Sequence, residues 1–158
     1  MNAQTMRALS LGLVVAVWAA ISHLAKIPFQ LWPALVGLAC FVAAGGGVPG
    51  LQKSVAGMVS GIIWAMLYVT ISGALGRQEI LDALVLGAAV FGIVMQAQIP
   101  LLSFTAGALA GAGVALGVMG VRVVTMQAGI RVAIALAIGA ALGWIAEWAM
   151  GMIKARRS

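Results

Sequence analysis

Residues 51–75 read LQKSVAGMVSGIIWAMLYVTISGAL, and this stretch decides the fold class. After Lys53 it holds no charged side chain. A helix needs about 20 predominantly apolar residues to cross the roughly 30 Å hydrocarbon core of a bilayer. The stretch therefore predicts a transmembrane helix.

Five further apolar runs lie on either side of this one. They cover residues 8–25, 31–44, 80–96, 101–119 and 128–153. Each run is continuously apolar, whereas the strands of a membrane β-barrel alternate in segments of about ten residues. The sequence thus predicts an all-α polytopic membrane protein with six transmembrane segments. We expect a single transmembrane domain, 1–158, with halves of about 1–75 and 76–153 and a short basic tail, 154–158.

The composition supports this class and excludes others. Hydrophobic residues make up 64% of the 158 residues and charged residues 8%, against about 45–50% and about 25% in a soluble domain. A chain of this length leaves much of its surface against solvent, so that solvent must be largely lipid. A soluble enzyme, a secreted disulfide scaffold and a disordered tail are therefore excluded. The lipid bilayer is the first expected partner.

The charges are few, and they bear on topology more than on partners. The formal net charge is +6, from nine Lys and Arg and three Asp and Glu. Outside the tail the basic residues are spread singly, which is typical of topology control, so no nucleic-acid partner is expected. Six spans place both termini on one side. The surplus of Lys and Arg on that side, most of it in the tail, favours the cytoplasm.

Residue types that carry enzyme chemistry are scarce. The chain has one His, one Cys and three acidic residues, and it holds no Walker loop, no H-E-x-x-H and no paired cysteines. We therefore do not expect an enzyme, a metal site or a cofactor. The single cysteine, Cys40, excludes an intrachain disulfide.

Two short segments suggest an internal repeat. Ile-Pro at 27–28 recurs at 99–100, and Ala-Leu-X-Gly at 34–37 recurs at 108–111, with offsets of 72 and 74 residues. Each match falls at the start of the second span of a three-span half. An odd number of spans per half inserts the halves in opposite orientations, as in inverted-repeat transporters. Chance is the alternative explanation, because Ala, Leu and Gly dominate this chain.

Proline and glycine interrupt the second and fifth spans most strongly. Paired broken spans in matching positions are the best sequence pointer to a site near the bilayer midplane. Irregular backbone at that depth is tolerated only inside protein or along a water-filled cavity. We expect broken or re-entrant second and fifth spans, with breaks at Pro28, Pro33, Gly45, Gly46, Gly47, Pro100 and Gly107.

Polar side chains near these breaks are candidates to line a solute pathway. Amides and hydroxyls around Pro100 could line such a path, or could satisfy backbone groups freed by the proline and join helices. Glu147 lies late in the sixth run between two tryptophans. Burial there would suggest a proton or cation role, and an interfacial position is the alternative. The pathway candidates are Gln30, Gln96, Gln98, Ser103, Thr105 and Glu147.

Glycines at helical spacing predict close helix packing. Small residues four apart let transmembrane helices approach each other closely. They serve either packing within one bundle or an oligomer interface. Because six short helices leave little room for a pore, we expect a homo-oligomer. The helix-packing candidates are Gly57, Gly61, Gly111, Gly113 and Gly117.

Several motifs occur together in a characteristic order. They are GGVPGL at 46–51, SGIIWAM at 60–66, QAQ at 96–98, LLSF at 101–104 and Gly107. In this order and spacing they resemble a bacterial inner-membrane family, domain of unknown function 1097, over most of the chain. The resemblance implies a small polytopic inner-membrane protein. It brings no established activity, substrate or catalytic residues.

These patterns favour a small membrane channel or transporter for a small neutral or weakly charged solute. Ion pores usually carry a ring of charges or coordinating carbonyls, and this chain has few charges. A non-transporting membrane scaffold or assembly partner, docking another membrane protein through its glycine-rich faces, is the alternative. A proton-coupled exporter that uses Glu147 is a second alternative.

Overall fold

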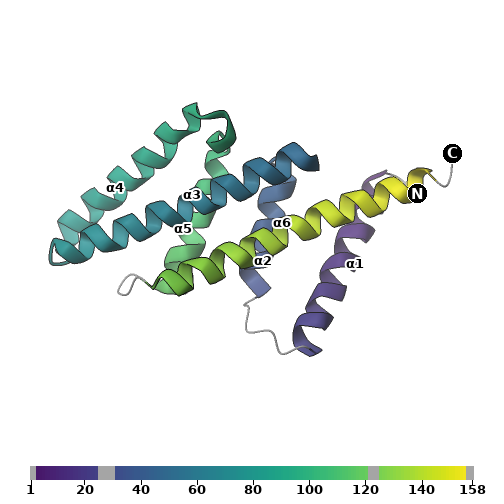
Figure 1. Cartoon of the computed structure of the whole chain (residues 1–158), viewed down its shortest axis with the longest axis horizontal. Helices are drawn as coiled ribbons and strands as arrows, with labels where there is room; N and C mark the ends of the chain where they lie inside the picture. Colours follow the sequence, from purple (N-terminus) through teal and green to yellow (C-terminus); the bar gives the residue numbers. More distant parts are fainter. Residues whose placement is uncertain (1–2, 25–30, 121–124, 156–158) are drawn as a thin grey trace.

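The computed structural model describes residues 3–24, 31–120 and 125–155. This part of the chain forms six α helices and no strand, so the prediction of an all-α chain is confirmed; Figure 1 shows their arrangement. The helices are α1 (Ala3–Leu24), α2 (Leu31–Ala43), α3 (Gly47–Ala74), α4 (Glu79–Met95), α5 (Thr105–Met119) and α6 (Met126–Ala155). Two 3-10 turns, η1 (Gln96–Gln98) and η2 (Pro100–Leu102), join α4 to α5.

Three segments of the described residues are long and apolar enough to cross a membrane. They are Gly47–Ala74, Glu79–Gln98 and Met126–Met152. The shorter helices α2 and α5 have 13 and 15 residues. At 1.5 Å per residue these helices are about 20 Å and about 22 Å long, less than the roughly 30 Å of a hydrocarbon core. The count of six transmembrane segments therefore stays a prediction.

The helices pack around a central pair, α3 and α6, which run in opposite directions (Figure 1). The short helices cross this pair: α2 packs chiefly on α6, and α5 packs chiefly on α3. α1 lies against α6 and α4 lies against α3, at opposite ends of the view. The main contacts of the first three helices therefore match those of the last three, with α1, α2 and α3 corresponding to α4, α5 and α6.

The core lies where α2, α3, α5 and α6 meet. Phe41, Met58 and Leu136 are at most 1% exposed there, beside the fully buried Ala115 and Ala140. Large side chains alternate with alanines in this cluster. Because an alanine adds little bulk, the helices can approach closely while the large side chains fill the remaining space.

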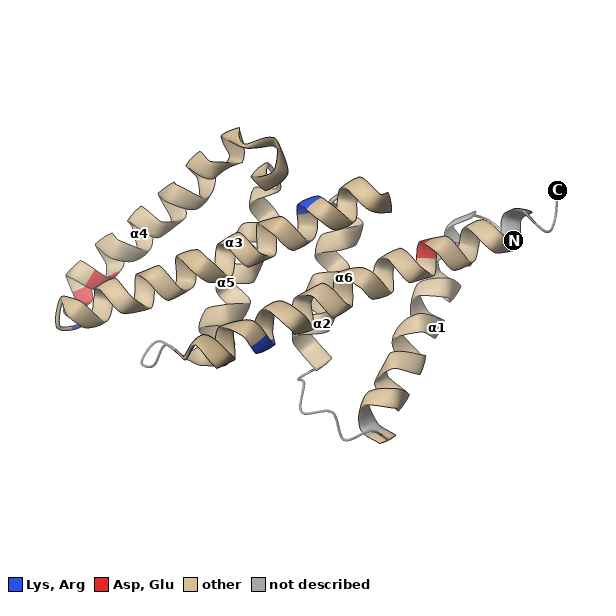
Figure 2. Cartoon of the chain, viewed as in Figure 1, with Lys and Arg blue, Asp and Glu red and all other residues tan. Residues whose placement is uncertain are grey.

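The outer faces of the helices are strongly apolar. Leu13 on α1, Ile80 on α4 and Ile63 on α3 are more than half exposed. Charged side chains are sparse on the described part of the chain (Figure 2). An apolar surface of this kind marks an interaction with a membrane or another protein, which agrees with the membrane class predicted from composition.

Two crossings bring backbones into direct contact through glycines. Where α3 meets α5, a Cβ on Gly61 would lie 2.7 Å from the carbonyl carbon of Ala108. Where α6 meets α2, a Cβ on Gly139 would lie 2.7 Å from the carbonyl carbon of Ala34. Both positions therefore exclude any side chain, since backbone cannot move aside as the tip of a flexible side chain can.

Each crossing has a second glycine one turn away, contributed by the opposite helix. A Cβ on Gly111 of α5 would lie 2.8 Å from the carbonyl carbon of Met58, and a Cβ on Gly37 of α2 would lie 2.8 Å from that of Leu136. The two crossings use residues at matching offsets in the chain. The offset is 74 residues from α2 to α5 and 78 residues from α3 to α6. The first value equals the offset of the Ala-Leu-X-Gly motif.

Two of the expected breaks do not interrupt their helices. Pro33 lies in the first turn of an unbroken α2. Proline is tolerated there because the first backbone N–H groups of a helix have no partner inside it. Gly107 lies in the first turn of an unbroken α5, where a Cβ would lie 2.7 Å from Cε1 of the Phe104 ring. It serves close packing, and the expectation of a break at these two positions is wrong.

The interruptions fall between the helices. Gly45 and Gly46 lie in the turn from α2 to α3, and Gly47 begins α3; their φ values are 93°, 73° and 65°, a region that favours glycine. Pro100 begins η2, two residues after η1 ends. Pro28 lies outside the described residues.

Candidate functional site

The segment between α4 and α5, together with the first residue of α5, holds four of the six polar pathway candidates. Gln96 in η1 joins this segment to α3 through both ends of its amide. Its Nε2 donates to the Ser60 hydroxyl at 2.9 Å, and its Oε1 accepts from the indole N–H of Trp64 at 3.0 Å. The Ser60 hydroxyl in turn donates to the Gly57 carbonyl at 2.8 Å. The amide of Gln96 is therefore engaged in helix–helix contact.

The remaining candidates in this segment differ in their surroundings. The Ser103 hydroxyl donates to the Pro100 carbonyl at 2.8 Å, so it satisfies a backbone group beside the proline. Gln98 is exposed and makes only a long contact, 4.0 Å, with the Met95 sulfur. Thr105 is half-buried at the start of α5. The amide of Gln98 is thus more exposed than that of Gln96, while Gln30 lies outside the described residues.

Glu147 on α6 reaches the glycine turn that begins α3. Its Oε2 accepts a hydrogen bond from the backbone N–H of Gly47 at 2.8 Å. Gly46 makes room for the carboxylate, because a Cβ there would lie 2.7 Å from the same oxygen. A negative charge at a helix N-terminus interacts favourably with the helix dipole. Glu147 is half-buried, and it ties the end of α6 to the turn between α2 and α3.

The sequence gives no direct signal for this long-range contact. Gly47 and Glu147 are separated by a hundred residues, and the sequence predicts a helix break for the first and an interfacial or proton-carrying site for the second. A carboxylate in an apolar run needs a polar partner, and three consecutive glycines expose backbone N–H groups. Those two facts together are the only pointer in the sequence.

A second carboxylate secures the hairpin of α3 and α4. The Ser72 hydroxyl donates to the Asp82 carboxylate, which lies in the first turn of α4. An acidic side chain in that turn favours the helix dipole. Neither residue faces the segment that holds Gln98, so we assign this contact to folding.

The glycine candidates separate into two groups. Gly57, Gly61 and Gly111 pack at the crossing of α3 and α5, since a Cβ on Gly57 would lie 3.0 Å from the Phe104 carbonyl oxygen. Gly113 has no neighbouring atom within 4 Å of such a Cβ, and Gly117 has only the Trp32 ring at 3.5 Å. Gly37 and Gly139 also pack closely, although they were not among the expected packing glycines. Gly37 closes the repeated Ala-Leu-X-Gly motif, whereas Gly139 had only the weak signal of lying four residues before Gly143.

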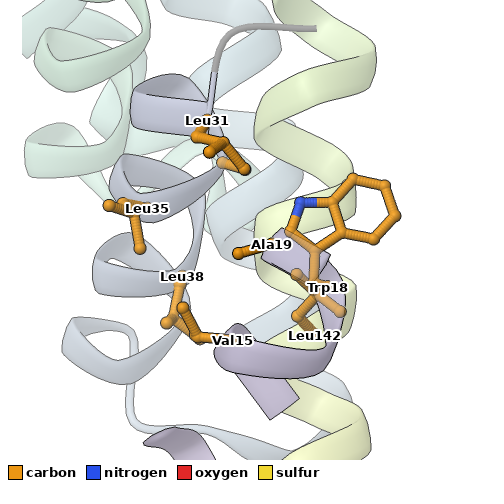
Figure 3. Close-up of a pocket in the computed structure, with 8 residues that line it drawn as sticks. Val15, Trp18, Ala19, Leu31, Leu35, Leu38 and Leu142 are labelled. Carbon is orange, nitrogen blue, oxygen red and sulfur yellow. The ribbon is translucent and has the colours of Figure 1, made fainter. Parts of the chain in front are cut away.

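The described residues hold no cluster of three or more His, Cys, Asp and Glu side chains that could bind a metal ion. A cavity of about 100 Å³ lies between α1, α2 and α6, and all of its lining residues are apolar (Figure 3). The segment between α4 and α5 can therefore form hydrogen bonds with a ligand, and the cavity beside α1 can make apolar contacts.

Comparison with known proteins identifies the family. Residues 8–151 match the family described as protein of unknown function, DUF1097. The chain belongs to this family. The DUF1097 match covers two of the three apolar segments completely, all but the last residue of the third, and both glycine crossings, and it confirms the resemblance drawn from the sequence motifs.

One relative of this DUF1097 chain carries a location in its name. The chain is 31% identical over 113 residues to the inner membrane protein YcdZ of Escherichia coli (strain K12), covering 71% of this chain and 68% of that protein. Together with the apolar helices, this relative supports an inner-membrane location. No solved structure matches the chain.

Proposed function

We propose that this DUF1097 protein is a small membrane channel or transporter for a small neutral or weakly charged solute. Its six helices would cross the membrane as two inverted three-helix repeats, and the working form would be a homo-oligomer. The observation that carries the proposal is the pair of matched glycine crossings, α3 with α5 and α2 with α6.

The matched crossings support two repeats because residues at equal offsets in the two halves make the same close contacts. Gly61 packs on Ala108, and Gly139 packs on Ala34. In both pairs the distance from the glycine's Cβ position to the carbonyl carbon of the alanine is the same. The central helices α3 and α6 are antiparallel (Figure 1). Many transporters pair inverted repeats of this kind and alternate their access by rocking one repeat against the other.

The shortness of α2 and α5 supports a pathway between the repeats. Each is shorter than the hydrocarbon core, and each adjoins an irregular segment, Gly45–Gly47 for α2 and 96–104 for α5. Non-helical backbone at membrane depth is tolerated where it is buried in protein or lines a water-filled cavity. The exposed Gln98 amide would then meet the solute, while Gln96 holds the segment to α3.

A flux measurement tests this function. The purified chain would be reconstituted into liposomes, and the entry of glycerol, urea and potassium would be followed separately. We expect entry of a neutral solute above that of empty liposomes, and no potassium entry. The variant Gln98→Leu should lower the flux, whereas Ser103→Ala should preserve it because its hydroxyl bonds the Pro100 carbonyl. Absence of flux for every solute would contradict the proposal.

A membrane scaffold is the second candidate, and one specific observation favours it. On the exposed face of α5, Gly113 has open space where a Cβ would stand. A small residue on an outer face can receive a helix of another protein. If Gly113→Leu abolished co-purification of a distinct membrane protein without changing flux, the scaffold function would be favoured.

A further inference from the structure

The cavity between α1, α2 and α6 lies at a position that has an equivalent in the other half of the chain. A side chain occupies the equivalent position, whereas the cavity is open. The cavity is lined by Val15, Trp18 and Ala19 of α1, by Leu142 of α6, and by Leu31, Ala34, Leu35 and Leu38 of α2. Figure 3 shows Trp18 and Leu142 on one side of it and the leucines of α2 on the other.

In the second half, a tryptophan occupies the matching place. Trp64 stands 78 residues before Leu142, the same offset that relates the glycines of α3 and α6. Its indole packs against α4 so closely that a Cβ on Gly92 would lie 2.7 Å from Cζ3 of the ring. Leu142 faces α1 instead, and its smaller side chain leaves about 100 Å³ open. The correspondence of these places rests on the repeat proposed above.

A second cavity adjoins the first on the apolar surface of the protein. This cavity of about 260 Å³ shares Trp18 and Leu142 with the first, and it is also lined by Leu13, Val17 and Ile21. Those three side chains are each about half exposed or more, so they belong to the face that meets lipid. An apolar cavity of roughly 150 Å³ stays dry and binds small hydrocarbons. Hydrocarbon from the bilayer can therefore reach the second cavity, and Trp18 and Leu142 stand between it and the first.

A buried hydroxyl lies on the same face of α1, one helical turn beyond Ala19 and outside the lining of both cavities. Val15, Trp18, Ala19 and Ser22 follow the three- and four-residue spacing of one helix face. Ser22 is 8% exposed, and its hydroxyl has no hydrogen-bond partner among the residues that the structure describes. A buried hydroxyl without a partner is costly. An occupant that combines an apolar chain with a polar oxygen at one end would satisfy both features.

We propose that the crevice between α1, α2 and α6 binds one acyl chain of a membrane phospholipid, with an ester oxygen near Ser22. The chain fills the space that Trp64 fills in the other half. The bilayer supplies this ligand at high local concentration, and the second cavity, which shares Trp18 and Leu142 with the first, lies on the side from which the ligand would arrive.

Native mass spectrometry of the full chain in mild detergent tests the site. We expect the protein to retain one phospholipid. Leu142→Trp should lower the retained fraction about tenfold, the change that corresponds to about 1.4 kcal/mol of binding. The matched control is Ile134→Trp, which adds the same side chain at an exposed position of α6 away from the cavity lining. Equal lipid retention by Leu142→Trp and Ile134→Trp would overturn the site.

Two further variants keep the test sharp if Leu142→Trp folds poorly. Ala19→Leu should also displace the lipid, since Ala19 lines the same cavity. Ser22→Ala should weaken retention, and unchanged retention would overturn the ester contact. A bound free fatty acid in place of phospholipid would overturn the assignment of the ligand.

A separate arm distinguishes this site from the proposed repeat. Trp64→Leu should open the matching place beside α4 and allow a second bound lipid. Binding of only one lipid to that variant would count against the correspondence of the halves. Because no arm measures transport, loss of the proposed function would leave the lipid result unaffected.

Discussion

Gly61 on α3 lies against the backbone of Ala108 on α5, with only 2.7 Å between the carbonyl carbon and the position that a Cβ would take. The same separation relates Gly139 on α6 to Ala34 on α2. These two contacts join the short helices to the long ones and define the arrangement of all four. Any added atom at either glycine must displace a helix.

The first prediction concerns these glycines. Gly61→Ala and Gly139→Ala should each lower the free energy of unfolding by about 1–3 kcal/mol, the usual cost of overpacking a well-packed core. Gly113→Ala is the matched control, because nothing lies within 4 Å of its added methyl group. Thermal unfolding of the detergent-solubilised protein measures all three. Equal destabilisation by Gly113→Ala would show that close packing is not the cause.

The second prediction concerns the capped turn at the start of α3. Glu147→Ala should lower the free energy of unfolding by roughly 0.5–2 kcal/mol, since the N–H of Gly47 loses its acceptor and the helix dipole loses a negative charge. Glu147→Gln should cost less because an amide oxygen can still accept. The measurement is again thermal unfolding, with both variants compared at one pH. Similar losses for Gln and Ala would assign the effect to charge alone.

The third prediction separates the two amides beside α5. Gln96→Leu should destabilise the protein by about 0.5–2 kcal/mol, because it removes the hydrogen bonds that join Ser60 and Trp64 to η1. Gln98→Leu should leave stability within about 0.5 kcal/mol, as expected for an exposed position. The same unfolding assay measures both variants. A larger loss for Gln98→Leu than for Gln96→Leu would reverse the roles that we assign to them.

The sequence predicted the helical class and most helix positions because apolar runs of this length have few alternatives. The run at 128–153 became α6, Met126–Ala155, and the run at 80–96 became α4, Glu79–Met95. The helix from 51–75 begins four residues earlier, at Gly47. The sequence did not predict this earlier start because glycine and proline, which are weak helix formers, lie among residues 47–50. In the structure the Glu147 carboxylate accepts a hydrogen bond from the first N–H of α3.

The details of the site depended on contacts that local sequence does not encode. Pro33 and Gly107 resembled breaks because proline and glycine are weak helix formers, yet the first turn accepts proline and the Phe104 ring covers the glycine. Gly139 gave no strong signal in a run already rich in alanine. Its role follows from the crossing with Ala34, which is a property of tertiary packing.

The orientation of the two halves is the central claim, and matched basic residues give access to it. Lys53 and Arg131 lie in the second turns of α3 and α6, each eight residues before the glycine of its crossing, and both are exposed. Inverted repeats would put these two residues on opposite sides of the membrane. Parallel insertion of α3 and α6 would put both on one side.

Cysteine labelling in intact cells tests this claim most directly. Cys40→Ser removes the single natural cysteine, and Lys53→Cys or Arg131→Cys then adds one reporter at a time. We predict that an impermeant maleimide labels only Arg131→Cys from outside, and that Lys53→Cys reacts only after the membrane is permeabilised. Labelling of both positions from the same side would contradict the inverted arrangement.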